Sequence, residues 1–92
     1  MKYEIILTSK FKKELKLAKK HGYDINLLDE IVTLLASGEP LPPKNKDHGL
    51  TGNWIGFRVC HIQPDWLLIY KIADKVLILT LVRTGSHSDL FG

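Results

Sequence analysis

The sequence has a single cysteine and no long apolar run, and each of these shortages narrows what the protein can be. Its one cysteine, Cys60, cannot form an internal disulfide, which agrees with a reducing compartment. No stretch of about 18 apolar residues is present, so the sequence predicts no membrane span. The N-terminus, Met1–Ile5, lacks the apolar core of a signal peptide. We therefore expect a cytoplasmic protein without a membrane partner.

The composition is that of an ordinary globular chain, with 45% hydrophobic and 25% charged residues, and the length of 92 residues predicts a single domain, 1–92. A net charge of +3 is mildly basic and permits a polyanionic partner. Lysines crowd residues 10–20, where Glu14 is the only acid. Composition leaves open whether they form a solvated helix face or an RNA contact. Those considered for RNA contact are Lys10, Lys13, Lys16 and Lys20.

The N-terminal part of the chain predicts one strand and two helices. A short strand covers Lys2–Leu7, and an amphipathic helix follows after an N-cap at Thr8 or Ser9. Gly22 ends this helix because glycine readily adopts a positive φ, and Asp24 caps the next helix. Only a few residues separate the helices, so we expect an antiparallel pair.

The C-terminal part predicts three antiparallel strands that reverse at Pro64-Asp65 and at Asp74-Lys75. Ser86 and Asp89 resemble a capping box, which predicts a short helical turn at the C-terminus. The fold class is therefore α+β, with the order β-α-α-β-β-β and the helix pair on one face of an antiparallel sheet. The strands are expected over Trp54–Cys60, Trp66–Ala73 and Val76–Val82.

Two of these strands carry apolar residues on both faces, as in Leu67–Ile69 and Leu77–Leu79. Both faces of the sheet should therefore be covered. Since the helix pair covers only one, the other must meet the C-terminal segment, a partner protein, or both.

Polar residues near the predicted turns and strand ends suit RNA cleavage without a metal ion. The ribose 2′-OH must lose a proton and attack phosphorus, the 5′-oxygen must gain a proton, and charge builds on the phosphate. Two imidazoles can divide the proton transfers, while a guanidinium holds the phosphate. Zinc is a weaker alternative, because His61 and Asp65 straddle a proline turn instead of sharing a helix face. The candidates are His48, His61, Asp65, Arg83 and His87, with Trp66 and Phe91 as aromatic neighbours.

Four short motifs, in this order and at these spacings, resemble the YafQ-like branch of the RelE/ParE superfamily of bacterial type II toxins. The resemblance covers nearly the whole chain. It implies a compact fold of the same order, and an mRNA interferase that needs no cofactor and cuts the codon in the ribosomal A site. A cognate antitoxin would hold it inactive, and any contact with DNA would run through that antitoxin. The motifs are Lys46–Leu50, Gly52–Arg58, His61–Lys71 and Arg83–Phe91.

The resemblance also implies roles for single residues. His87 would be the general acid on the leaving oxygen, and Arg83 would stabilise the phosphate. His48 or His61, oriented by Asp65, would be the base. The lysine-rich helix would contact ribosomal RNA, and the second sheet face would be an antitoxin site. The residues implied to form the active site are His48, His61, Asp65, Arg83, His87 and Phe91, with Trp66 and Phe91 shaping the site or stacking against the mRNA.

Two other functions compete with this one. A ParE-like toxin would bind a topoisomerase without cutting RNA, but a pure binding module has no need of three imidazoles around one cleft. A DNA-binding regulator would fit the basic charge, yet the sequence has no helix-turn-helix pattern.

Overall fold

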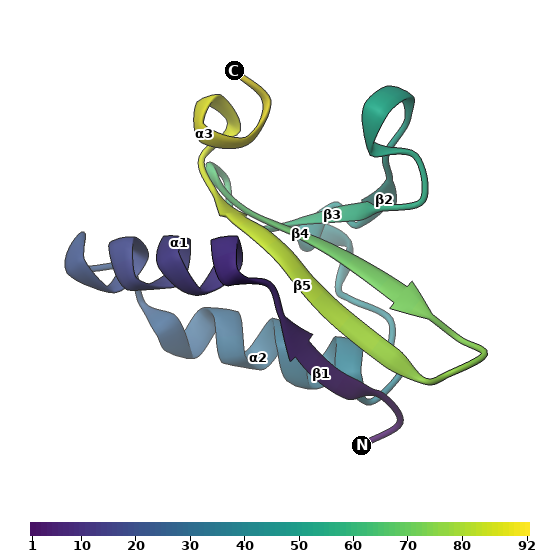
Figure 1. Cartoon of the computed structure of the whole chain (residues 1–92). Coiled ribbons are helices and arrows are strands. Elements are labelled where there is room, and N and C mark those ends of the chain that lie inside the picture. Colours follow the sequence, from purple (N-terminus) through teal and green to yellow (C-terminus); the bar gives the residue numbers. More distant parts are fainter.

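The computed structural model describes residues 1–92 and has one five-stranded sheet at its centre (Figure 1). The strands are β1 (Glu4–Leu7), β2 (His48–Gly49), β3 (Arg58–Gln63), β4 (Trp66–Ala73) and β5 (Ile78–Gly85). The helices are α1 (Ser9–Lys20), α2 (Ile25–Ala36) and α3 (His87–Phe91), with short 3₁₀ turns η1 (Pro43–Asn45) and η2 (Gly52–Trp54). The strand order is β1-β5-β4-β3-β2. This confirms the predicted α+β class.

Strand pairing differs from the expectation in one respect. The strands β2 to β5 are antiparallel to their neighbours, as predicted, but β1 pairs with β5 in parallel. Parallel neighbours need a long connection between them. Here α1, α2 and three other strands lie between β1 and β5 in the chain, so β5 can return beside β1 in the same direction. The added strand β2 lies within the proline-containing loop, at the opposite edge of the sheet.

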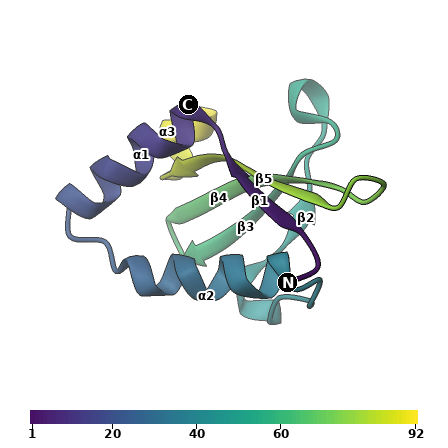
Figure 2. The ribbon, with the colours of Figure 1, turned by 60° about the horizontal axis from the view of Figure 1, so that its bottom comes forward.

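Both long helices begin at the predicted caps. The Thr8 hydroxyl accepts a hydrogen bond from the Phe11 amide at 3.0 Å, and the Asp24 carboxylate accepts one from the Asn26 amide at 3.0 Å. Gly22 ends the first helix with φ +80°, as expected. The helices run in opposite directions, as predicted, but they are joined at one end and spread apart at the other (Figure 2).

The larger core lies between these helices and one face of the sheet. Cys60 is fully buried in it, and burial raises the pKa of the Cys60 thiol to about 12. The thiol therefore packs as a small hydrophobe, as its position in the sequence suggested. The buried residues of this core are Tyr3, Phe11, Ala18, Leu28, Ile31, Leu35, Ala36, Cys60, Ile62, Trp66, Leu68, Tyr70, Leu79 and Leu81.

The other face of the sheet carries a smaller core that the C-terminal helix covers. Leu90 of α3 is buried against it, which confirms the C-terminal part of the expectation that something must cover this face. Trp54 and Phe57, from the segment before β3, pack at its margin. The buried members are Val59, Leu67, Ile69 and Leu90.

Only the strand Trp66–Ala73 has both predicted bounds. β1 begins at Glu4 instead of Lys2, β3 ends at Gln63 instead of Cys60, and β5 ends at Gly85 instead of Val82. The first strand of the hairpin begins at Arg58 instead of Trp54, because Gly52 and Gly56 take φ of +62° and +90°, which a strand does not allow. The last strand begins at Ile78 instead of Val76, since the turn continues through Leu77 at φ +54°. The reversal at Pro64-Asp65 is confirmed, with Gln63 paired to Trp66 across it. None of the helices has the length and apolarity needed to cross a bilayer.

Candidate active site

The hairpin turn and the C-terminal helix meet through one carboxylate. Asp65 in the turn accepts a hydrogen bond from the backbone N–H of His87 at 2.9 Å, and its Oδ1 lies 2.7 Å from His87 Nδ1. The backbone bond from His87, followed by the imidazole bond, lowers the pKa of the Asp65 carboxyl. A capping box between Ser86 and Asp89 fixes the start of α3 as predicted. The first residue of this helix, His87, is therefore held by its backbone and by its ring.

Three histidines are anchored in the same way. His48 Nδ1 lies 2.8 Å from the Lys46 carbonyl oxygen, and His61 Nδ1 lies 3.3 Å from the Pro64 carbonyl oxygen. A carbonyl oxygen only accepts, so each Nδ1–H donates and the other ring nitrogen, Nε2, has no hydrogen bond within the chain. His87 binds Asp65 through Nδ1 as well. Each ring thus presents Nε2 for proton transfer.

The sheet register brings two of these histidines to one face. His48 is paired with Val59, and His61 lies two residues further along β3, so both side chains project from the face that α3 covers. The ring centroids of His61 and His87 are 5.3 Å apart. The structure therefore joins His61, Asp65 and His87 in one cluster, with His48 on the adjacent strand.

Asp65 corrects one expectation from the sequence. It was expected to orient His48 or His61, but its hydrogen bonds go to His87. The reason is the turn: with Gln63 paired to Trp66, the Asp65 side chain lies at the tip of the hairpin, where the first turn of α3 arrives.

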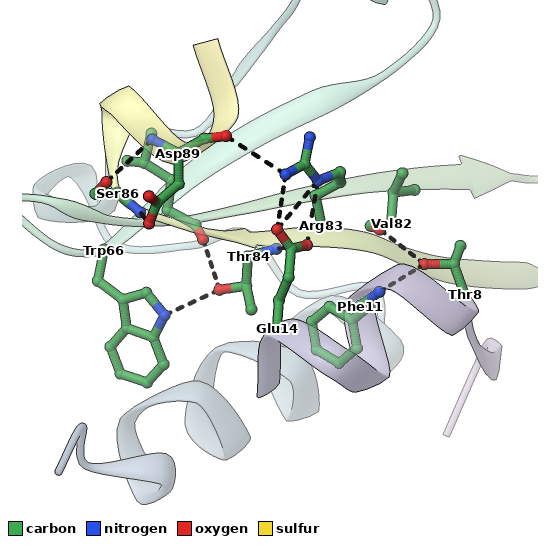
Figure 3. Close-up of polar contacts among 10 residues, drawn as sticks. Thr8, Phe11, Glu14, Trp66, Val82, Arg83, Thr84, Ser86 and Asp89 are labelled. Atoms are coloured by element: carbon green, nitrogen blue, oxygen red, sulfur yellow. Dashed lines mark hydrogen bonds and ion pairs between the residues drawn. The ribbon is translucent and has the colours of Figure 1, made fainter. Parts of the chain in front are cut away.

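Arg83 is paired with Glu14, an acid that is not among the residues predicted for the site. Its Nη2 lies 2.7 Å from Glu14 Oε2, and its Nε lies 3.1 Å and 3.2 Å from the two carboxylate oxygens (Figure 3). Hydrogen bonding to Glu14 raises the pKa of the Arg83 guanidinium. The only signal in the sequence was that Glu14 is the single acid among the lysines of residues 10–20.

The two aromatic candidates have different environments. The Trp66 indole donates to the Thr84 hydroxyl at 2.9 Å (Figure 3). It is 2% exposed and packs edge-on against Tyr23, so neither ring face is open to a base. The expectation that Trp66 stacks against mRNA is therefore wrong, because its indole belongs to the core. Phe91 is 44% exposed and packs edge-on against Trp54 with ring centroids 6.2 Å apart.

The lysines proposed to contact RNA are all exposed on α1. Their side chains lie on the part of the helix that faces away from the buried Phe11 and Ala18. The lysines are Lys10, Lys13, Lys16 and Lys20.

Zinc was the weaker alternative for His61 and Asp65. These two residues do not combine with a third His, Cys, Asp or Glu into a metal-binding group.

Comparison with known families matches this chain over residues 3–92 to a family described as the bacterial toxin of a type II toxin-antitoxin system, YafQ. The chain belongs to the YafQ toxin family. This confirms the resemblance that the four motifs indicated. The matched residues include every strand and helix of the fold.

Individual YafQ relatives agree with the family match. The mRNA interferase toxin YafQ of Escherichia coli K12 is 46% identical over 90 residues, covering 97% of this chain and 96% of that protein. The toxin in the crystal structure of the E. coli DinJ-YafQ complex superposes with a TM-score of 0.90 at 44% identity, covering 98% of this chain and 99% of that one. A metal-bound toxin from Helicobacter pylori superposes with a TM-score of 0.92 at 48% identity, covering 97% and 99%.

Proposed function

We propose that this YafQ toxin cleaves messenger RNA by acid-base catalysis at the cluster of His61, Asp65 and His87. As the family match and the 46% identical interferase indicate, the chain is the toxin of a type II toxin-antitoxin system and an endoribonuclease of the mRNA interferase kind. The observation that carries the mechanism is the pair of imidazoles with ring centroids 5.3 Å apart, one of them bound to a carboxylate.

His87 is the general acid in this mechanism. Its Nδ1 is bound to the Asp65 carboxylate, which fixes the ring and leaves Nε2 of the protonated imidazole free to give its proton to the 5′-oxygen. His61 is the base that takes the 2′-OH proton, because its ring lies beside that of His87 and its Nε2 has no hydrogen bond in the chain. His48, one row away on the same face, is the second candidate for the base.

Arg83 stabilises the phosphate, and Phe91 contacts a nucleotide base. The guanidinium is fully charged and lies beside the C-terminal helix, where its Nη2 is 3.4 Å from the Asp89 carbonyl oxygen. The exposed ring of Phe91 is the aromatic surface that remains for stacking once Trp66 is assigned to the core.

The partners follow from the same proposal. The DinJ-YafQ complex supports a cognate antitoxin that binds this toxin, and any contact with DNA runs through that antitoxin. The exposed lysines of α1 contact ribosomal RNA while the toxin cuts the message in the ribosomal A site, so it acts in the cytoplasm. No cofactor takes part.

Inducible expression in a bacterial host, followed by mapping of mRNA 5′ ends, tests the proposal. Wild type should arrest growth and produce in-frame cuts in translated messages, and His87→Ala should reduce cleavage by about 10²–10⁴-fold because the leaving oxygen loses its acid. His21→Ala is the matched control, since His21 is exposed at the end of α1, outside the cluster, and should cut like wild type. Growth arrest without cuts, unchanged in His87→Ala, would instead favour the topoisomerase-binding alternative.

A further inference from the structure

The hydrogen bonds of Arg83 leave one edge of its guanidinium free. Glu14 accepts from Nε and Nη2, and the Asp89 carbonyl oxygen accepts from Nη2 at 3.4 Å. Nη1 has no hydrogen-bond partner in the chain, and Figure 3 shows it on the side of the guanidinium turned away from Glu14. An arginine has five N–H donors, so both donors on Nη1 remain available to a ligand.

Glu14 can occupy this position because β1 is shorter than β5. The parallel pairing ends where Leu7 meets Leu81, so the backbone of β5 beyond that point has no strand neighbour on this side. Glu14 partly replaces the missing strand, since its Oε1 accepts from the Thr84 amide at 3.3 Å. Phe11, one turn earlier on α1, is 1% exposed and anchors the helix.

The ion pair of Arg83 and Glu14 has a defined geometry because both side chains are largely buried. The Arg83 and Glu14 side chains are 18% and 14% exposed, which excludes most of the solvent that would otherwise compete for their hydrogen bonds. Two donors of the guanidinium are aligned with one carboxylate, and that carboxylate is in turn fixed by the Thr84 amide. The orientation of Arg83 is therefore set by α1, an element that carries none of the histidines of the cluster.

We propose that Glu14 is a positioning residue for RNA cleavage, which holds Arg83 by Nε and Nη2 and directs Nη1 toward the scissile phosphate. This rests on the proposed function of Arg83. An arginine that is already oriented avoids the entropic cost of being ordered in the transition state. Glu14 also offsets the positive charge of Arg83, so removing it should not weaken the attraction between the toxin and RNA.

The test compares Glu14→Ala, Arg83→Ala and the double variant on ribosomes halted on a defined message, with rate and half-saturating toxin concentration measured separately. Glu14→Ala should lower the maximal cleavage rate about 10–100-fold, with the half-saturating concentration unchanged or lower. In the Arg83→Ala background the same change should have no further effect, because there is no guanidinium left to position. Glu30→Ala, which removes an exposed glutamate of α2, is the control and should match wild type.

A wild-type rate in Glu14→Ala, or an equal loss of rate with and without Arg83, would overturn the inference. Glu14→Gln is the second variant, because it keeps an acceptor for Thr84 and Arg83 while removing the charge. Its cleavage rate should lie between those of wild type and Glu14→Ala. A rate equal to that of wild type would overturn the inference. His87→Ala is measured in parallel. If that variant still cuts, the proposed function fails; if only the Glu14 variants cut normally, the role of Glu14 fails.

Discussion

The two faces of the sheet differ in how they are covered. The face under α1 and α2 buries fourteen residues, including Phe11, Trp66 and Leu68. The opposite face buries four, under one short helix, and carries His48 and His61. β4 serves both, because its alternating side chains are apolar in each direction. One face therefore supplies most of the buried apolar packing, while the thinner cover of the other leaves room for the polar residues that we propose act on RNA.

Truncating a side chain on the face under α1 and α2 should have the largest effect on stability and none on the cleavage rate. Leu68→Ala removes a fully buried side chain and should lower the free energy of unfolding by about 2–5 kcal/mol, because the cavity cannot fully collapse. Urea denaturation checks this, with Leu17→Ala as control, since that leucine is 51% exposed and should cost less than about 0.5 kcal/mol. Cleavage per folded molecule should not change. A variant with a slower rate per folded molecule would mean that the two faces are not separable.

Truncating the thinner face should affect stability less and activity more. Leu90→Ala should cost about 2 kcal/mol, at the lower end for a buried leucine, because the small cluster can partly collapse. It should also slow cleavage, since Leu90 seats the helix that begins with His87. Urea denaturation and cleavage are measured on the same preparation. A loss of stability with a normal rate would show that α3 only covers the sheet and does not position His87 for the proposed cleavage.

The smallest effect concerns the pH dependence of the contact between the turn and α3. The pKa of Asp65 should lie below its ordinary value of about 3.8, and carboxyl NMR titration measures it. A group with a lowered pKa stabilises the folded state above its unfolded pKa, so this contribution is present at neutral pH and is lost as the pH falls below about 4. In His87→Ala the pKa should rise only partly, because the backbone N–H still donates. A full return to the ordinary value would assign the shift to the imidazole alone.

Local patterns in the sequence predicted the elements with local causes. The caps at Thr8 and Asp24, the turn at Pro64 and the capping box at Ser86 each depend on residues a few positions apart, and each is present in the structure. The misplaced starts of β3 and β5 also have local causes, but positive φ at Gly56 and Leu77 could not be separated from an extended strand by apolar alternation alone.

The α+β order, the apolar character of both sheet faces and the choice of candidate histidines could be predicted, because they depend on residue type and short-range spacing. Three features of the site could not be predicted in this way: Asp65 binds His87, Trp66 belongs to the core, and Glu14 holds Arg83. Each of these contacts joins residues far apart in the chain. They depend on strand register and on where β1 ends, which no local pattern specifies.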